Sequence, residues 1–362
     1  MVNDTNKKNN KKIIFKKEFR QNVKTATVSA VNSTASIAAP TVITSVVNSV
    51  VTIADFICAE TGLSKSTVKK VMLSGAVWVR NAKKHLANSR SLTRVRRATK
   101  ELHHNDYVEM YYDEKILKST MTTPPFPIFE CEHYGVWYKP AGVLSQGTKF
   151  GDHISILRWV EIEIEKKIIA KKETKNKSVF LIHRLDLEVS GIMIFAYTKR
   201  AAALLSELFK NHQIEKHYIA IVNGHVSLSE ITLNNKLDNL DAETHCKCLQ
   251  KFEFENAKFT MLAVRITTGR YHQIRRHLKY ARHSVVGDSL YRSNSSDSIA
   301  DYKIVNLNKI LGSAETEGNQ QEQPKNKRLF LKAVGINFKC PLTKEIKNFY
   351  YDKETWSIKL SL

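Results

Sequence analysis

One short stretch of the chain concentrates side chains that can do chemistry, and it reads His183-Arg184-Leu185-Asp186-Leu187-Glu188-Val189-Ser190-Gly191. An imidazole, a guanidinium, a carboxylate and a hydroxyl fall within it. Apolar runs at residues 179–182 and 192–196 predict a strand on each side, so the polar groups lie in a loop or at a sheet edge held by rigid strands. This placement indicates catalysis or ligand contact. The alternative is a structural turn in which Asp186 bonds its own backbone.

Three other segments place polar groups beside a predicted turn. Strands at residues 136–144 and 216–224 each run into a glycine turn, and a third turn leads into a helix. These segments contain, in order, Lys139-Pro140-Ala141-Gly142, Lys216-x-Tyr218-x-Ala220-x-Val222-x-Gly224 and Gly269-Arg270-x-His272-Gln273-Ile274-Arg275. Each is a weak signal on its own, because a lone Gly-Arg-x-His is usually structural and a single histidine is more often a satisfied interior residue than a catalyst.

The composition favours a polyanionic partner. The 362 residues include 57 Lys and Arg against 35 Asp and Glu, a formal net charge of +22. A charge so far from zero favours nucleic acid or an anionic membrane surface as partner. No apolar run approaches the roughly 18 residues of a membrane helix, and there is no pattern of a secretory signal. We therefore expect a cytoplasmic protein that binds nucleic acid and not a membrane.

The cysteines give no sign of a disulfide framework or a zinc site. They are Cys58, Cys131, Cys246, Cys248 and Cys340. Their spacing matches neither pattern, because the Cys-x-Cys pair lacks a second pair. We expect free thiols in a reducing compartment.

The first part of the chain divides where the composition changes. Residues 1–50 are basic and then low in complexity, so disorder is expected there. An ordered unit is expected at residues 51–115. Helical periodicity at 52–60 and 65–73 begins it, and a strand at 107–112 closes it.

The rest of the chain reads as a linker and one large unit. Prolines mark residues 116–127 as an interdomain linker. Residues 128–362 form the large unit, with amphipathic helices expected at 158–172 and 199–210. Within it, residues 293–327 are rich in polar residues and are expected to be a surface insertion.

The small unit resembles the αL-type RNA-binding domain named after ribosomal protein S-four. Two short helices, a Gly-Ala-Val-x-Val hairpin and an Asn-Asp turn into a closing strand carry the resemblance. It implies that the second helix and the following loop present basic residues to RNA, here Lys65, Lys69, Lys70, Arg80 and Lys83. Such residues bind phosphate and set register more than they read bases. The family's usual Val-Asn-Gly is Val79-Arg80-Asn81 in this chain, and the alternative is a basic surface that binds nothing.

The four motifs, in this order, closely resemble the RluA-type family of RNA pseudouridine synthases over most of residues 127–350. The resemblance implies an α+β fold, with a central, mainly antiparallel mixed sheet flanked by helices and a small α/β RNA-binding domain in front. It also implies isomerisation of uridine to pseudouridine in structured RNA. The base leaves its ribose at nitrogen 1, turns and rejoins through carbon 5. No redox step or external group transfer is needed, so neither a cofactor nor a metal is implied.

The resemblance also implies roles for single residues. Asp186 corresponds to the catalytic aspartate, a nucleophile when ionised. Arg275 corresponds to the arginine that keeps this carboxylate ionised. Tyr218 corresponds to the tyrosine packed on the target base, whose hydroxyl can relay a proton. Arg184 corresponds to an arginine that fills the space of the flipped-out nucleotide. Further residues expected to contact RNA or support the site are His183, Lys139, Arg270, His272 and Gln273.

Some positions depart from the family's motifs. Val189 stands where Thr is usual, Lys332 and Cys340 where His is usual, and Tyr271 where Thr is commoner. None of these changes removes the aspartate, the tyrosine or the arginine, so we expect an active enzyme. A large-subunit ribosomal RNA substrate is favoured, because a second RNA-contact surface suits a large folded substrate. The alternatives are a tRNA substrate and, from another class, an inactive RNA-binding or ribosome-assembly protein. No obligate protein partner is indicated.

Overall fold

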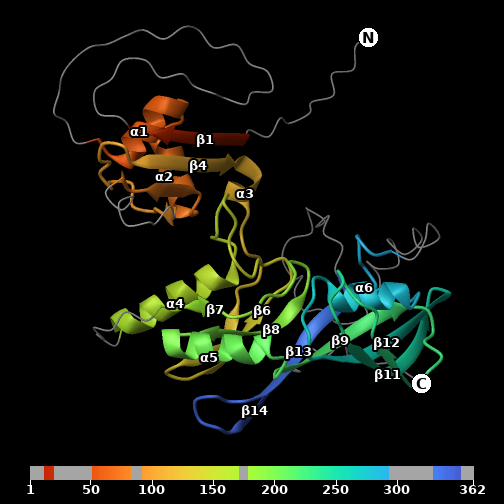
Figure 1. Cartoon of the computed structure of the whole chain (residues 1–362). Helices are drawn as coiled ribbons and strands as arrows, with labels where there is room; N and C mark the ends of the chain where they lie inside the picture. Colours follow the sequence, from red (N-terminus) through yellow and green to blue (C-terminus); the bar gives the residue numbers. More distant parts are fainter. Residues whose placement is uncertain (1–11, 20–50, 83–91, 171–177, 293–328, 352–362) are drawn as a thin grey trace, which may run out of the picture. The chain divides into compact units, whose positions relative to one another are not determined.

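The structure, a computed structural model, describes residues 12–19, 51–82, 92–170, 178–292 and 329–351. Figure 1 shows the order of the helices and strands along the chain. The chain forms two compact units: unit 1 is Met1–Thr120 with Gln146–Arg158, and unit 2 is Met121–Ser145 with Trp159–Leu362. The surface insertion expected at 293–327 lies outside the described residues. Among the described residues, no helix is both long and apolar enough to cross a lipid bilayer.

Unit 1 is a four-stranded antiparallel sheet with two helices packed on one face. The strands lie in the order β1, β4, β2, β3. Their bounds are β1 Lys12–Glu18, β2 Val77–Arg80, β3 Thr93–Arg94 and β4 Tyr107–Asp113, and the helices are α1 Ile53–Thr61, α2 Lys65–Leu73 and α3 Glu114–Lys118. The side chains of Thr52 and Ser64 cap α1 and α2 by accepting backbone N–H groups, and Gly62, at φ 68°, ends α1 in the left-handed conformation.

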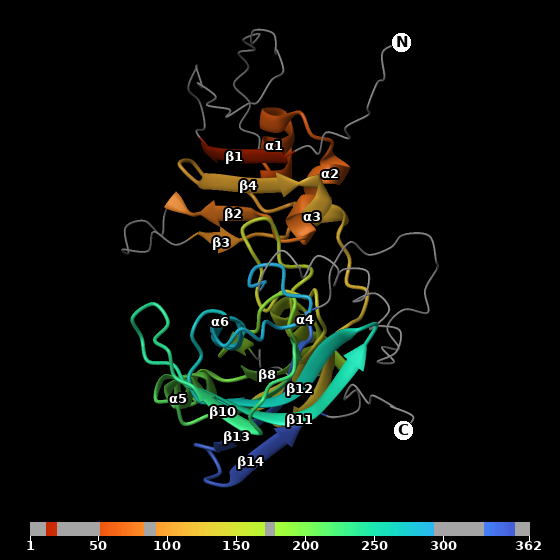
Figure 2. The same cartoon turned by 90° about the vertical axis from the view of Figure 1, so that its right-hand side faces the viewer.

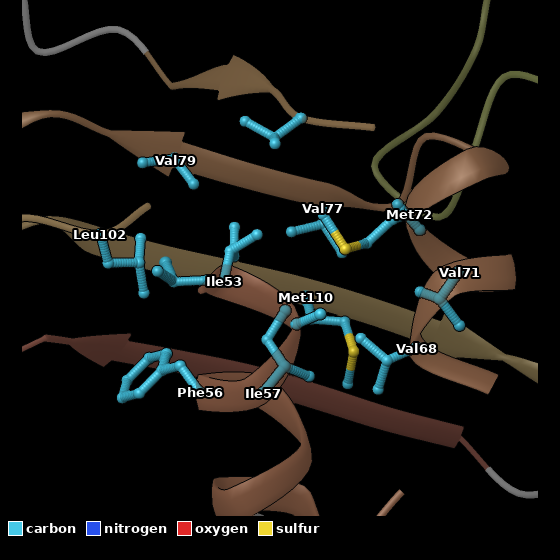
Figure 3. Close-up of a cluster of buried hydrophobic side chains, with 14 of the residues drawn as sticks. Ile53, Phe56, Ile57, Val68, Val71, Met72, Val77, Val79, Leu102 and Met110 are labelled. Atoms are coloured by element: carbon cyan, nitrogen blue, oxygen red, sulfur yellow. The ribbon is translucent and has the colours of Figure 1, made fainter. Parts of the chain in front are cut away.

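The core of unit 1 lies between these helices and the sheet. Figure 3 shows apolar side chains of α1 and α2 meeting those of β2 and β4. Fully buried members include Ile53, Ile57, Val68, Met72, Val77 and Met110. The helical members recur every three or four residues and the strand members every second residue, so each element buries one face. This is why the sequence pattern predicted these elements well.

The expectation of disorder throughout residues 1–50 is wrong for one segment. Residues Lys12–Glu18 form β1, which pairs along its whole length with β4, from Lys12 opposite Asp113 to Glu18 opposite Tyr107. Ile13 and Phe15 pack against the core of unit 1. The lysines of β1 obscure the alternation of apolar and polar residues in the sequence. The strand forms because it can pair with the edge of β4.

Unit 2 is built on a ten-stranded sheet. Eight strands follow the order β10, β11, β12, β9, β13, β8, β6, β5, with β14 paired to β13 and β7 to β8. Every pairing is antiparallel except that of β13 with β8, which confirms the predicted mixed, mainly antiparallel sheet. The strands are β5 Phe126–Glu130, β6 Tyr134–Lys139, β7 Phe180–Leu181, β8 Ser190–Ala196, β9 Glu215–Asn223, β10 Glu230–Leu233, β11 Thr244–Phe254, β12 Ala257–Ile266, β13 Leu331–Lys339 and β14 Ile346–Tyr350.

Three further helices accompany this sheet, and Figure 2 shows them in a second view. They are α4 Ile156–Ala170, α5 Lys199–Lys210 and α6 Gln273–Tyr280. Helix α5 buries Ala201 and Leu205 in a cluster with Val136 of β6 and Ile194 of β8. Helix α6 follows β12 and contacts β11. The strands and α6 together bring segments far apart in sequence to one place on the sheet.

Candidate active site

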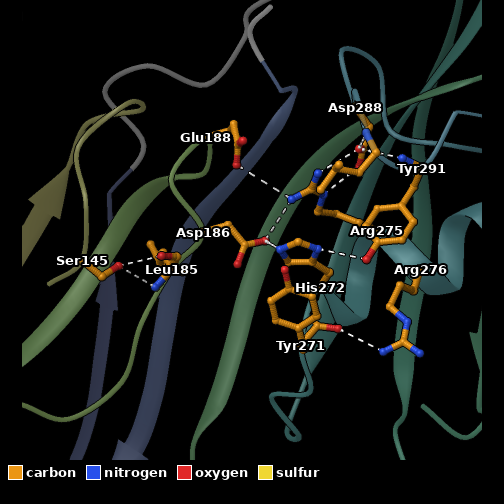
Figure 4. A network of polar contacts seen from close by, with 11 residues as sticks. Ser145, Leu185, Asp186, Glu188, Tyr271, His272, Arg275, Arg276, Asp288 and Tyr291 are labelled. Atoms are coloured by element: carbon orange, nitrogen blue, oxygen red, sulfur yellow. Dashed lines mark hydrogen bonds and ion pairs between the residues drawn. The ribbon is translucent and has the colours of Figure 1, made fainter. Parts of the chain in front are cut away.

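Asp186 lies in a turn between β7 and β8, with its side chain 22% exposed. The backbone closes this turn, because the Val189 N–H donates to the Asp186 carbonyl over 3.2 Å. The preceding residue is clamped from the side. The Ser145 hydroxyl donates to the Leu185 carbonyl at 2.6 Å and accepts the Leu185 N–H at 3.0 Å, as Figure 4 shows. The turn is thus held by groups other than the Asp186 carboxylate, which is left to face other side chains.

Lys139 fixes the other side of the same turn. Its ammonium is enclosed and donates to the carbonyls of Pro140 at 3.1 Å, Val143 at 2.7 Å and Leu187 at 3.2 Å. Burial lowers the pKa of Lys139 to about 7, although the charges of Asp186 and Glu188 oppose that shift. Lys139 was expected to contact RNA or to support the site, and its hydrogen bonds to three backbone carbonyls fit the supporting role. It positions the turn.

Arg275 joins three carboxylates. Its guanidinium makes a bidentate pair with Asp288, at 2.7 Å from Nε and 2.8 Å from Nη2. Its Nη1 lies 3.3 Å from Asp186 and 3.8 Å from Glu188. Burial alone would lower the pKa of Arg275, but the Asp288 hydrogen bonds and the nearby negative charges outweigh it, so the pKa is raised. The arginine therefore stays charged and presents a cation to the Asp186 carboxylate.

His272 approaches the same carboxylate from a strained backbone position. At φ 50° it occupies the left-handed region, which is uncommon for a residue other than glycine. Its Nε2 lies 3.5 Å from Asp186 Oδ2, and its Nδ1 lies 3.0 Å from the Tyr291 hydroxyl. Burial lowers the pKa of His272 despite the attraction of Asp186. The imidazole beside Asp186 is therefore neutral near neutral pH.

Tyr218 lies on β9 in the middle of the sheet and is 8% exposed. Burial, and then the negative charge of Asp186, raise the pKa of Tyr218 above its ordinary value. The phenol therefore stays protonated near neutral pH. Tyr218, Asp186 and Arg275, which the sequence predicts together, are brought together by β9, the turn before β8, and α6.

Two other predicted RNA-contact residues make their contacts within the protein. Gln273 is buried, accepts from Thr268 and from the Arg270 N–H, and donates to the Glu243 carbonyl and the Thr244 hydroxyl, so its prediction as an RNA contact is wrong. His183 is partly buried, accepts the Ile194 N–H through Nε2 at 2.9 Å and stacks on Phe209, and burial lowers its pKa to about 3.

The remaining predicted contact residues lie nearer the surface. In unit 2, Arg184 is exposed and Arg270 donates through Nε to the Asp241 carbonyl at 3.0 Å. In unit 1, Lys69 and Lys70 of α2 are exposed. There, too, Lys65 pairs with an aspartate at 2.6 Å, and Arg80 lies over a tyrosine ring at 4.6 Å. Lys83 falls outside the described residues.

The sequence reasoning missed Ser145, Asp288, Tyr291 and Lys216 as site residues. Lys216 donates to the carbonyls of residues 267 and 268, which begin the turn to α6, and burial lowers its pKa to about 8. One feature of the sequence could have indicated Asp288 as a site residue. It follows a glycine shortly after the helix that carries Arg275, and a buried arginine requires a carboxylate.

A hollow of about 500 Å³ elsewhere on the sheet is a weaker candidate. His217, His245 and Arg265 line it. Their polar groups are already paired: His217 and Arg265 with Glu215, and His245 with Thr232 and Glu243. His217 precedes Tyr218 on β9, so their side chains point to opposite faces of the sheet. This hollow lacks the converging, incompletely paired groups that surround Asp186.

The fold and the site define a class of protein. Residues 133–280 match the family described as RNA pseudouridylate synthase. The matched region contains Asp186, Tyr218 and Arg275, and Asp288 lies just after it.

Particular relatives carry more specific names. A protein of Haemophilus ducreyi named tRNA pseudouridine synthase C is 34% identical over 137 residues, covering 32% of this chain and 56% of that protein. One of the same name from Pectobacterium carotovorum subsp. carotovorum is 26% identical over 206 residues, covering 50% and 52%. An uncharacterized RNA pseudouridine synthase of Mycoplasma genitalium is 28% identical over 189 residues, covering 48% and 58%. The chain thus spans little more than half the length of these relatives.

At two of the positions that depart from the family's motifs, the side chain lies away from the Asp186 carboxylate. The Val189 side chain is buried, and its backbone makes the turn bond described above. Lys332 of β13 pairs with Ile219 of β9, while the next residue, Ala333, pairs with Tyr218. Lys332 therefore points to the sheet face opposite Tyr218, where its ammonium lies over two tyrosine rings.

Proposed function

We propose that this protein isomerises uridine to pseudouridine in structured RNA, with Asp186 as the nucleophile. One observation carries the proposal: the Asp186 carboxylate faces a buried guanidinium, Arg275, that Asp288 holds in place. The charge-assisted hydrogen bond from this guanidinium holds the carboxylate in one orientation, as a positioned nucleophile requires. The match of residues 133–280 to the RNA pseudouridylate synthase family supports the same reaction.

The proposed reaction keeps every atom of the substrate. The bond between ribose carbon 1′ and ring nitrogen 1 breaks, the base turns, and a bond from carbon 1′ to carbon 5 forms. The proton on carbon 5 is lost and nitrogen 1 gains one. Asp186 holds the intermediate as a covalent adduct, through the ribose or through the base. Tyr218 packs against the base and stays protonated, so its hydroxyl can donate or relay that proton.

The substrate class within RNA is a finer question. A preference for ribosomal RNA was expected from the sequence. Two of the three relatives reported above are named tRNA pseudouridine synthase C, so a tRNA substrate fits at least as well. The test is to incubate separate tRNA and ribosomal RNA fractions, from a strain lacking the gene, with the purified protein and to map pseudouridine. New sites in one fraction assign the substrate, and none in either, with RNA binding intact, would favour an inactive RNA-binding protein.

We also propose that unit 1 binds RNA phosphate through α2. Lys69 and Lys70 are exposed on this helix and are its available cations, whereas Lys65 is already paired. Reversing both charges, Lys69→Glu with Lys70→Glu, should weaken RNA binding and lower the slope of log affinity against log salt by about one per lost phosphate contact. A matched control is Lys118→Glu, whose ammonium pairs with Glu114 on α3. An unchanged salt slope would contradict this role for α2.

A further inference from the structure

Tyr271 presents an exposed aromatic ring beside the candidate nucleophile. It is 62% exposed, among the most exposed large side chains described. Its ring stacks on that of His272, with centroids 3.7 Å apart and an interplanar angle of 21°. His272 in turn lies 3.5 Å from Asp186. Figure 4 shows the side chains of Tyr271, His272 and Asp186 next to one another in this order.

The backbone holds this ring in place. His272 has the left-handed conformation at the start of α6, which turns its ring toward Asp186 and brings Tyr271 alongside. The Tyr271 carbonyl accepts a hydrogen bond from Arg276 at 3.4 Å. Arg276 is itself fixed by Asp238, at 2.8 and 3.1 Å. A strained residue next to a site is a reason to look for function there.

We propose that Tyr271 stacks on an RNA base next to the target nucleotide and so strengthens the binding of RNA whose target base is flipped out. This inference rests on the proposed function. One face of the ring is covered by His272, which contacts Asp186, and the exposed remainder is a flat surface. Removing a target base from its stack leaves neighbouring bases without a stacking partner. An aromatic ring provides one for any base, since every base has a π face.

A simpler role for Tyr271 is to shield His272 from water. The two roles predict different kinetics. Stacking on a neighbouring base acts on bound substrate and transition state alike, so its loss raises KM and leaves kcat nearly unchanged. Loss of a shield changes the environment of His272 and Asp186, so it lowers kcat and shifts the pH profile.

The experiment compares three variants of the full chain on the RNA fraction in which pseudouridine forms. Tyr271→Ala removes the ring, and Tyr271→Phe keeps it without the hydroxyl. Tyr280→Ala is the matched control, because Tyr280 is a similarly exposed tyrosine, 56%, at the far end of α6. The dissociation constant for total tRNA is measured by filter binding for each protein alongside kcat and KM.

Tyr271→Ala should raise KM and the dissociation constant by about 5- to 150-fold, with kcat within about threefold. Tyr271→Phe and the control should stay within about twofold of the wild type. Unchanged binding by Tyr271→Ala, or a fall in kcat alone, would overturn the stacking role. If the wild type forms no pseudouridine, the reaction proposal fails, and the binding measurement with tRNA still decides the stacking proposal.

Discussion

The carboxylate of Asp186 lies 3.3 Å from the guanidinium of Arg275, although 89 residues separate them. The other edge of the same guanidinium is clamped by Asp288, whose side chain is fully buried. Asp288 also accepts the backbone N–H groups of residues 290 and 291. Burial would raise the pKa of Asp288, but the hydrogen bonds and charge of Arg275 outweigh it, so the pKa is lowered. Asp288 therefore neutralises and aims the arginine, and Asp186 receives its remaining edge.

Removing this arginine should unfold much of the site. Arg275→Met leaves Asp288 as an uncompensated buried charge, which should lower the free energy of unfolding by about 3–5 kcal/mol and abolish activity. The control is Arg276→Met on the next position, whose partner Asp238 is 64% exposed and whose loss should cost about 0–1 kcal/mol. Denaturant titration of both variants measures the difference. Equal losses would show that burial of the Arg275 pair has no special weight.

We expect the small side chain of Ser145 to affect kcat as well as the stability of the protein. Ser145→Ala removes both hydrogen bonds to Leu185 and leaves a buried N–H and carbonyl unsatisfied beside Asp186. We expect a loss of about 1–3 kcal/mol in stability and a fall in kcat, because the turn loses its clamp. Ser155→Ala is the control: this buried serine donates to a backbone carbonyl in unit 1. A similar stability loss with unchanged kcat is expected there, and an equal fall in kcat would contradict the assignment.

The lowered pKa of Lys139 should make the free energy of unfolding depend on pH. Its pKa is about 7 in the folded protein and about 10.5 when exposed. Between these values the unfolded chain binds more protons, so the stability of the wild type relative to Lys139→Met should rise from pH 7 to pH 10, by on the order of 4 kcal/mol at most. Unfolding both proteins across this range tests it. A difference that does not vary with pH would mean that the three carbonyls keep the ammonium charged.

The activity should show no titration of the Tyr218 hydroxyl between pH 6 and pH 10. Since burial and Asp186 raise its pKa, the phenol stays protonated at pH values below 10. The ratio of activities of the wild type and Tyr218→Phe should therefore be constant between pH 6 and pH 10. A ratio that changes with a midpoint near pH 8 or 9 would show that Tyr218 ionises during turnover.

The fold was predictable where one periodicity dominates a segment. Helices α2 and α5 and strands β4 and β9 begin and end within about one residue of the expected positions, because each buries one face or lies in the sheet centre. Strands β1, β10 and β11 were not predicted. Their exposed positions carry charged or polar residues, and β1 and β10 are edge strands that form only by pairing with a neighbour.

The kinds of side chain in the site could be predicted from the sequence, but their arrangement in space could not. No spacing rule connects Asp186 with Arg275, so only the resemblance to a family linked them. The sequence shows that Lys139 and His183 have basic side chains, but it does not show which groups surround them. The carbonyls that enclose Lys139 come from three positions, one of them 48 residues away. Tertiary structure alone tells a buried cation from an exposed one.

The most direct test of the account is the pseudouridine content of RNA from a strain lacking the gene, after incubation with the wild type and with Asp186→Asn. This substitution keeps the size of the side chain and removes its charge. The account predicts new pseudouridines with the wild type and none with Asp186→Asn, while both proteins bind the RNA. Pseudouridine formed equally by Asp186→Asn would contradict it.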